Sequence, residues 1–488
     1  MNAKAVLCLV ALVSVVGPAG SGAAAGEKPR PNVLLVISDD LNCRVGCYGD
    51  RVAKTPNLDR LAAMGVRFER AYCQFPLCNP TRCSVLSGRY PTTTGVLDNN
   101  TLLMLEGGMV LMPQLFADKG YAVAEHGKIW HGPNKGFSST DAKRPANWST
   151  PAERARQQAE EPDYWDKHHS PYRHREVEHP EQYAWANVYG PLEEGDRGRD
   201  APVADAAIAS LREFKSQSEP FFLAVGFRLP HVPLTAPKEY FDLYDPAEMP
   251  LPPDFANEPT LAPDVPRDEW RVNLDLFAGR PFSEAEAREA IRAYYASTSY
   301  MDAQLGRVLD ELESLDLRRN TIIVFWGDHG WHLSEKGMWA KGTTFEVSAH
   351  GPLLIADPRR KETAGRSSPR VVQYLDMYPT LVELCGVEPP VGLEGNSLAP
   401  LLKDPQAPWD KPAYTVQTRG WFIGHSVRTE RWRYTEWDEG RRGAMLFDHM
   451  GDPHELGNLA DDPASADVVA EMKRLLNDGP VAPRPLRR

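Results

Sequence analysis

Cysteine is scarce in this chain, with seven among 488 residues, whereas 42% of the residues are apolar. Small domains held together by disulfides carry far more cysteine, so this fold must depend on an ordinary hydrophobic core. One cysteine, Cys78, belongs to a motif described below. The others that follow residue 25 are expected to be buried thiols, with a local bond between the first two left open: Cys43, Cys47, Cys73, Cys83 and Cys385.

The chain also lacks an excess of basic residues. It has 55 Lys and Arg against 67 Asp and Glu, for a net charge of −12. Without a basic stripe to neutralise phosphates, nucleic acid is excluded as a partner. An anionic ligand would have to be attracted by a local group of cations, because the overall field repels it.

Long hydrophobic runs are missing beyond the first residues. The run Ala5–Val16 follows Lys4 and precedes the small residues 23–25, a pattern that predicts a signal peptide over residues 1–25. No later run is long enough to cross a bilayer, so we expect no stable membrane insertion. The sequence therefore predicts an exported protein, periplasmic or secreted.

Four apolar runs indicate strands that end in chemically active side chains. Residues 32–38 are almost continuously apolar, as in a strand buried on both faces of a parallel sheet, and Asp39 and Asp40 follow directly. Three later apolar runs are also followed by such side chains. The run 121–124 precedes Lys128 and His131, the run 221–227 precedes His231, and the run 321–326 precedes Asp328 and His329. Sites of doubly wound sheets lie at the carboxyl ends of strands, so these side chains should converge.

The predicted architecture is α/β, with a large domain over residues 26–402 and a smaller C-terminal α+β subdomain over residues 403–488. Long loops at residues 133–200 and 244–270 should wall a pocket. The expected helices cover residues 56–64 (capped by Thr55), a long stretch opened by the capping box Ser283–Glu286, and residues 374–385. The subdomain should hold an antiparallel sheet of strands 413–417, 422–428, 432–436 and 445–448, closed by a helix over residues 464–476.

The segment Cys78–Arg89 (CNPTRCSVLSGR) predicts a short helix behind a reactive residue. Asn79 is a favourable N-cap, Pro80 suits the first helical position, and Gly88 is placed to end the helix. Cys78 would then face the free N–H groups of the helix, with Arg82 directed at the same point.

This segment resembles the signature of the type I, formylglycine-dependent sulfatases, in which the cysteine is oxidised after translation. Thr81 stands where that family most often has Ser. The resemblance is closest to the iduronate-2-sulfatase branch and its bacterial relatives, and it implies an alkaline-phosphatase/sulfatase-like fold with a large mixed sheet sandwiched by helices. His332 and Lys336 depart from the animal enzyme, which leaves the substrate open. The matching segments outside the signature are 46–50, 220–226, 230–231, 328–331, 339–341, 426–429 and 446–453.

Three carboxylates at one sheet edge, those of Asp39, Asp40 and Asp328, predict a bound cation, because their charges would otherwise repel one another. Carboxylate oxygens favour Ca²⁺ or Mg²⁺ over zinc. The resemblance implies one Ca²⁺ per chain, held by the three carboxylates together with His329 and the modified Cys78.

The resemblance also implies catalytic roles. A formylglycine-generating maturation enzyme would oxidise Cys78 to 3-oxoalanine, whose hydrated aldehyde attacks sulfur. His231 would protonate the leaving alcohol and His131 would accept the proton that accompanies sulfate release. Trp331 and Lys341 would bind the substrate. The residues expected to stabilise charge on the sulfuryl oxygens are Arg82, Lys128 and Lys341.

The predicted activity is hydrolysis of sulfate esters of a sulfated carbohydrate, most specifically the 2-O-sulfated uronic acid of glycosaminoglycans. Three alternatives stay open on the sequence alone. The substrate could be another sulfated polysaccharide. The chain could hydrolyse phosphate or phosphonate esters with the same fold. If Cys78 were never oxidised, it could be a non-catalytic carbohydrate-binding protein.

Overall fold

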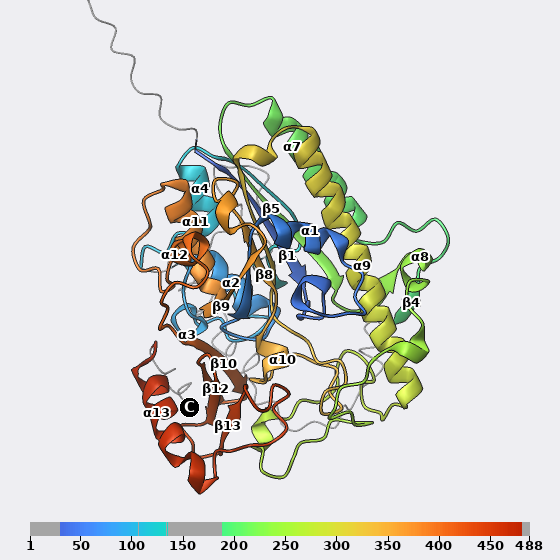
Figure 1. Ribbon diagram of the computed structural model, residues 1–488, viewed down its shortest axis with the longest axis vertical. Coiled ribbons are helices and arrows are strands. Elements are labelled where there is room, and N and C mark those ends of the chain that lie inside the picture. Colours follow the sequence, from blue (N-terminus) through green and yellow to red (C-terminus); the bar gives the residue numbers. More distant parts are fainter. Residues whose placement is uncertain (1–29, 106, 133, 135–187, 481–488) are drawn as a thin grey trace, which may run out of the picture. The chain divides into compact units, whose positions relative to one another are not determined.

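The computed structural model describes residues 30–105, 107–132, 134 and 188–480 (Figure 1). The predicted signal peptide and most of the loop predicted at residues 133–200 lie outside the described residues. The described residues from Pro31 onwards belong to one compact unit, so the domain boundary expected after Leu402 stays a prediction. Within the described residues, no helix combines the length and the apolar character needed to cross a membrane.

A seven-stranded mixed sheet organises the large domain, in the order β3-β5-β1-β7-β8-β2-β9. All of its strands run in the same direction except β8, which pairs antiparallel with both of its neighbours. Their bounds are β1 (Asn32–Asp39), β2 (Val66–Tyr72), β3 (Ala122–Gly127), β5 (Phe221–Pro230), β7 (Thr321–Gly327), β8 (Leu353–Ala356) and β9 (Arg366–Gln373).

The sheet separates two hydrophobic cores because side chains alternate along each strand. In β1, Leu34 and Val36 enter one core and Val33 and Leu35 enter the other. The helices of the first core are α1 (Pro56–Met64), α7 (Ala201–Lys215) and α9 (Glu284–Ser314), and those of the second are α2 (Cys78–Ser87), α4 (Met112–Asp118), α11 (Met377–Cys385) and α12 (Ala399–Lys403). Figure 1 shows these two sets of helices on opposite sides of the strands. The predicted fold class is confirmed.

The carboxyl ends of the parallel strands meet at one edge of the sheet. Asp39 ends β1, Lys128 follows β3, His231 follows β5 and Asp328 follows β7. The predicted convergence of the four strands is therefore confirmed. Strand β2, which no sequence pattern indicated, ends at the same edge and leads through a short loop to Cys78.

Helix α2 begins earlier than predicted. Its N-cap is Leu77 and its first residue is Cys78, so the prediction of Asn79 as N-cap is wrong. The Asn79 side chain instead donates to the carbonyl oxygens of Asp98 (3.0 Å) and Thr101 (2.8 Å), which tethers the following loop. Gly88 ends the helix in the left-handed conformation, with φ 68°, as predicted.

The N-terminus of α1 is capped from a distant part of the chain. Thr55 occupies the N-cap position, but its hydroxyl accepts from the Gly46 amide and not from the helix. The carboxylate of Asp302, on α9, accepts from the amides of Asn57 (3.0 Å) and Leu58 (2.7 Å). A side chain on the facing helix thus satisfies the N–H groups that a local cap would have taken.

The C-terminal part forms the predicted four-stranded antiparallel sheet, in the order β10-β11-β12-β13. Its strands are β10 (Ala413–Arg419), β11 (Phe422–Arg428), β12 (Trp432–Trp437) and β13 (Ala444–Asp448), and α13 (Ala466–Asp478) packs on β11 and β12. The other α-helices and strands among the described residues are α3 (Pro91–Thr94), β4 (Tyr189–Pro191), β6 (Leu234–Ala236), α8 (Lys238–Phe241) and α10 (Glu346–Ala349).

All six cysteines in the described residues carry free thiols. The local Cys43–Cys47 bond that the sequence left open is not formed, and both side chains are half-buried rather than buried. The prediction of buried thiols holds for Cys73, Cys83 and Cys385.

Candidate active site

Cys78 lies at the centre of a buried cluster of charged side chains. The residue is fully buried, and its Sγ is 3.4 Å from His329 Nε2, 3.5 Å from Lys341 Nζ and 3.8 Å from Lys128 Nζ. Asp40 Oδ1 is 4.0 Å from the same sulfur. Burial raises the pKa of the Cys78 thiol well above its usual value, so the thiol is protonated and is a weak nucleophile as it stands.

Asp39 is held by two cations. Arg82 Nη2 lies 3.1 Å from Asp39 Oδ1, and Lys128 donates to the other carboxylate oxygen. Burial alone would raise the pKa of Asp39, but the positive charges around it, Lys128 foremost, hold that pKa well below the usual value. Lys128 can reach Asp39 because Gly226 of β5 lies against its backbone, where a Cβ would overlap the Lys128 carbonyl.

Asp40 follows β1 in the left-handed conformation, with φ 60°, which turns its side chain away from the strand direction. Lys341 Nζ donates to its two carboxylate oxygens at 2.6 and 2.8 Å. Two groups fix this backbone: the Asp40 amide donates to Asp328 Oδ1 (3.0 Å), and the Tyr294 hydroxyl donates to the Asp40 carbonyl (2.8 Å). Tyr294 lies on α9 and carried no signal in the sequence beyond its place on an apolar helix face.

Asp328 and His329 complete the cluster from the end of β7. Arg82 Nε donates to Asp328 Oδ2 at 3.0 Å, so a single guanidinium bridges Asp328 and Asp39. His329 Nδ1 is 2.9 Å from the Gly330 carbonyl, which places the proton on Nδ1. The free Nε2 then faces Cys78 and lies 3.6 Å from Asp40 Oδ1.

The charges of this cluster balance within the protein. Three carboxylates face three cationic side chains, and each carboxylate has at least one cation within hydrogen-bonding distance. The argument that three acids at one edge require a metal is therefore weaker than the sequence implied. The acids are Asp39, Asp40 and Asp328, and the cations are Arg82, Lys128 and Lys341.

The chemistry of the donor set nevertheless fits a cation. Oxygen atoms of Asp39, Asp40 and Asp328 lie within 4.8 Å of one another, and all three residues are fully or almost fully buried. Three carboxylates offer up to six oxygens, the kind of ligand that Ca²⁺ prefers. His329 and the side chain of residue 78 adjoin the same space.

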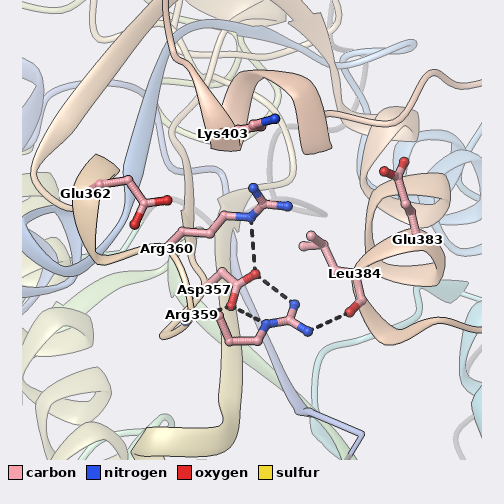
Figure 2. A pocket seen from close by; sticks show the side chains of 7 residues that line it. All are labelled: Asp357, Arg359, Arg360, Glu362, Glu383, Leu384 and Lys403. Carbon is pink, nitrogen blue, oxygen red and sulfur yellow. Dashed lines mark hydrogen bonds and ion pairs between the residues drawn. The ribbon is translucent and has the colours of Figure 1, made fainter. Parts of the chain in front are cut away.

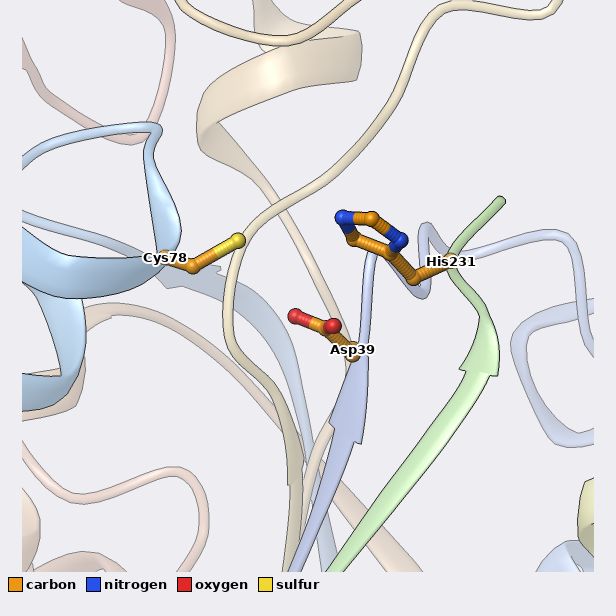
Figure 3. Close-up of side chains that lie close together, drawn as sticks. All are labelled: Asp39, Cys78 and His231. Carbon is orange, nitrogen blue, oxygen red and sulfur yellow. The ribbon is translucent and has the colours of Figure 1, made fainter. Parts of the chain in front are cut away.

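Two histidines face the cluster in neutral form. The His231 ring and the Cys78 sulfur point towards each other over Asp39, as Figure 3 shows. His231 Nδ1 is 2.7 Å from the Val232 carbonyl, so its Nε2 carries the lone pair, 3.9 Å from Asp40 Oδ2. Burial, followed by Lys341, lowers the pKa of His231 to about 3. Burial and Lys128 lower the pKa of His131 to about 2.

Trp331 is not among the side chains of the cluster. It is fully buried in the first core, stacked on Tyr294 at 5.9 Å between ring centroids and packed edge-on against Trp339 at 6.1 Å. The substrate contact predicted for Trp331 is therefore not supported by its position. Every other predicted site residue lies in or beside the cluster.

A pocket of about 890 Å³ lies next to the segment that carries Lys341. It is formed by residues from Glu258 to Pro281 and so includes part of the loop predicted to wall the site. Asn273 in its lining accepts from the Trp339 amide (2.7 Å) and donates to the Gly337 carbonyl (3.2 Å). Asp275, on the same segment, interacts electrostatically with Lys341, and no motif in the sequence pointed to it.

A second pocket, of about 380 Å³, lies at the opposite edge of the sheet, where β8 ends (Figure 2). Asp357 there pairs with Arg359 (2.7 Å) and Arg360 (3.3 Å). Three acidic and three basic residues line this pocket, so their formal charges balance and the pocket has no excess of positive charge to attract an anion.

Comparison with known proteins identifies the family. The sulfatase family model matches residues 31–387, and a model for the C-terminal part of N-sulphoglucosamine sulphohydrolase matches residues 334–480. The chain belongs to the sulfatase family. Its reaction class is therefore the hydrolysis of sulfuric esters, as predicted.

Individual relatives agree with this membership. A sulfatase of Formosa agariphila is 32% identical over 475 residues, which cover 92% of this chain and 87% of that protein. Iduronate 2-sulfatase of Homo sapiens is 31% identical over 480 residues, covering 83% of this chain and 84% of the human enzyme. The solved structure of a 2-O GAG sulfatase has the same fold, with a TM-score of 0.69 and 24% sequence identity to this chain. The alignment covers 92% of this chain and 91% of the chain in that structure.

Proposed function

We propose that this sulfatase is exported, carries formylglycine at position 78 and one Ca²⁺, and removes 2-O-sulfate from a uronic acid at the end of a glycosaminoglycan fragment. The observation that carries the proposal is the position of Cys78, with His329, Lys341 and Lys128 within 3.8 Å of its sulfur. A protonated, buried thiol is a weak hydrogen-bonding group and gains little from these polar neighbours, whereas they would orient an oxygen nucleophile at the same position.

The modified residue and the metal supply the chemistry that the twenty standard side chains lack. Formylglycine, made from Cys78 by a maturation enzyme, contributes on hydration a hydroxyl that can attack sulfur, and Ca²⁺ contributes Lewis acidity at the sulfuryl oxygens. The side chains that would hold the ion are those of Asp39, Asp40, Asp328, His329 and residue 78.

The role of the three cations follows from how firmly each is held. Arg82 is fixed by Asp39, Asp328 and two backbone carbonyls, so it serves to orient the carboxylates more than to move towards substrate. Lys128 and Lys341 each combine one carboxylate partner with a position near Cys78. These two ammonium groups are placed to bind the sulfuryl oxygens when a metal takes over part of the carboxylate charge.

Proton transfer falls to the two histidines. His231 has Nε2 directed at the reaction space, so it can protonate a leaving alcohol only after it has gained a proton itself. An anionic sulfate ester beside Nε2 favours the charged imidazole and raises its pKa from the low value of the empty site. His131, neutral and close to Lys128, is suited to accept a proton when sulfate leaves.

The sugar specificity is supported by similarity to iduronate 2-sulfatase and by cations beside Lys341. Arg419 of β10 donates to the Gly342 carbonyl at 2.6 Å, immediately after Lys341 in the chain. A carboxylate on the substrate would meet positive charge here, and a charged hydrogen bond contributes about 1.5–3 kcal/mol. Reduction of the substrate carboxylate to an alcohol should therefore lower kcat/KM roughly tenfold to a hundredfold.

The test has two parts. Mass spectrometry of the peptide that contains residue 78, from protein made beside a maturation enzyme, should show the aldehyde; Cys78→Ala should abolish turnover and leave the unfolding temperature unchanged. A panel of sulfated disaccharides and matching phosphate esters then identifies the substrate. Desulfation of neutral galactose or fucose sulfates with 2-O-sulfated uronates untouched would overturn the uronate proposal, and faster phosphate ester hydrolysis would overturn the preference for sulfate.

A further inference from the structure

Unmodified Cys78 belongs to a group of ligands that suits a softer metal than calcium. Its Sγ lies 3.4 Å from His329 Nε2 and 4.0 Å from Asp40 Oδ1, and these nitrogen and oxygen atoms are 3.6 Å apart. All three residues are fully buried, and their donor atoms come from three separate parts of the chain. A thiol, an imidazole and a carboxylate thus form one compact triangle.

This triangle has nearly the dimensions of a tetrahedral zinc site. With Zn–S near 2.3 Å and Zn–N and Zn–O near 2.0–2.1 Å, neighbouring donors lie about 3.3–3.6 Å apart. The three observed separations match this to within about 0.5 Å, which small side-chain movements can supply. Ca²⁺ takes oxygen ligands and has little affinity for sulfur, so the thiol form and an oxygen form of residue 78 should favour different metals.

We propose that the chain with an unmodified Cys78 binds one Zn²⁺ through Cys78, His329 and Asp40, and that oxidation of the cysteine destroys this site. On binding, a zinc–sulfur bond forms, the S–H bond breaks and the proton passes to solvent; the metal keeps its oxidation state. Zinc held in this way occupies Asp40 and excludes calcium from it. Zinc binding does not depend on the proposed activity; only its loss on oxidation does.

The surroundings allow an ion to enter and to complete its coordination. His231 belongs to a second group, with Asp39 and Cys78, whose ligand atoms lie within 4.8 Å of one another (Figure 3). Its side chain is 16% exposed, against 0% for Asp40 and His329, so the cluster opens to solvent on this side. Zinc must displace Lys341 from Asp40, and the released ammonium group stays close to the sulfur.

One other group among the described residues has metal-like spacing and provides an internal control. Glu346, His449 and Glu455 have ligand atoms within 4.8 Å of one another but include no thiol. Arg433 pairs with both glutamates and Arg428 pairs with Glu346, so two arginines already balance the two acids. A divalent ion there would leave two uncompensated buried charges, whereas at the Cys78 group the thiolate formed on binding offsets one of them, so we expect no zinc at the Glu346 group.

The experiment uses the full chain produced without a maturation enzyme, incubated with excess ZnCl₂ and freed of unbound metal by gel filtration. Elemental analysis should find about one zinc per chain. Loss of a residue that only supports a metal ligand typically weakens metal binding up to about a hundredfold. Cys78→Ser and His329→Ala remove ligands themselves, so each should weaken zinc binding by at least roughly a hundredfold. Cys47→Ser, which removes a half-buried thiol away from the cluster, and His449→Ala should leave the stoichiometry unchanged.

Cobalt gives a second readout that does not depend on activity. Co²⁺ bound to the unmodified chain should show a thiolate charge-transfer band in the near ultraviolet, and Cys78→Ser should abolish it. Should His329→Ala fail to fold, the Cys78→Ser comparison decides alone. The proposal is overturned by zinc far below one per chain, by equal zinc in Cys78→Ser, by loss of zinc in His449→Ala, or by equally tight zinc binding in the aldehyde form.

Discussion

Lys341 donates to both carboxylate oxygens of Asp40, at 2.6 and 2.8 Å. The same ammonium group lies 3.5 Å from Cys78 Sγ, and nearby carboxylates, Asp40 first, overcome burial and raise the pKa of Lys341 well above its ordinary value. A permanently charged side chain therefore occupies the carboxylate that calcium would need. We therefore expect Lys341 to compete with the proposed calcium for Asp40 and to become available to the substrate once the metal is bound.

Replacement of this lysine should separate metal binding from catalysis. In Lys341→Met the competing cation is gone, so calcium affinity should rise, whereas kcat/KM should fall roughly tenfold to a hundredfold because a charged hydrogen bond to substrate is lost. Calorimetric titration with Ca²⁺ and steady-state kinetics measure the two effects. Lys336→Met is the matched control, since Lys336 pairs with Asp254 at 2.8 Å outside the cluster. A fall of both quantities together would contradict the competition.

The balance of three acids and three cations gives a second prediction. Asp39→Asn leaves Arg82 and Lys128 with one buried negative charge fewer, and an unpaired buried charge of this kind costs about 3–5 kcal/mol. The metal-free variant should unfold at lower denaturant concentration than the wild type and should bind no calcium.

Asp357→Asn is the control for Asp39→Asn. It also removes a buried acid from two arginines, but at the opposite edge of the sheet (Figure 2). This variant should lose stability and keep its calcium. Urea unfolding measures the loss of stability in both variants, and elemental analysis measures their bound calcium. Full calcium occupancy in Asp39→Asn would show that Asp39 is not a calcium ligand.

The strands that deliver the site are predictable from the sequence, because an apolar run closed by acids is typical of a buried strand in a parallel sheet. This pattern indicates strands at residues 32–38 and 321–326, and the sheet confirms both. Local patterns are less informative about partners. They group Asp39, Asp40 and Asp328 as acids but do not indicate the cations that neutralise them, because such pairing depends on contacts hundreds of residues apart.

Helix starts show the same limit. Asn79 and Thr55 are both favourable N-cap residues, yet neither side chain caps its helix, since tertiary contacts engage them elsewhere. By contrast, the predicted capping box Ser283–Glu286 is formed at an exposed helix start, even though Glu286 also pairs with Arg280 (2.8 Å). Propensity decides the outcome where the chain is exposed and yields to packing where it is buried.

The distant cap of α1 gives a third prediction. Asp302→Ala leaves the buried amides of Asn57 and Leu58 without an acceptor, and each such loss costs about 1–3 kcal/mol. We expect a total loss of about 2–6 kcal/mol in the free energy of unfolding. Turnover should be preserved, because α1 lies away from Cys78. Asp302→Asn, which keeps one acceptor oxygen, should lose about half as much; an unchanged urea midpoint in the alanine variant would show that the cap contributes nothing.

Stability should also depend on pH through His350. Burial lowers the pKa of His350 to about 4, from an ordinary value of 6.5, so the folded protein holds the ring neutral while the unfolded chain protonates it earlier. The contribution of His350 to the free energy of unfolding is therefore fully present above pH 6.5. It is lost as the pH falls towards 4, by up to about 3 kcal/mol. In His350→Gln the fall in unfolding free energy over this window should be shallower by that amount, and parallel curves for the two proteins would contradict the assignment.

Replacement of Trp331 tests its predicted contact with the substrate, which the buried position of the ring does not support. Its ring is fully buried against Tyr294 and Trp339, so it acts by packing beneath the turn that presents Asp40, whose carbonyl Tyr294 binds. Trp331→Phe keeps an aromatic ring and creates a small cavity, which should cost about 1–3 kcal/mol in unfolding free energy. The KM for a sulfated disaccharide should stay within about twofold of the wild type, since no contact with the sugar is removed. A tenfold rise in KM at unchanged stability would instead mean that Trp331 reaches the substrate, as the family resemblance first implied, and that the core around it opens during turnover.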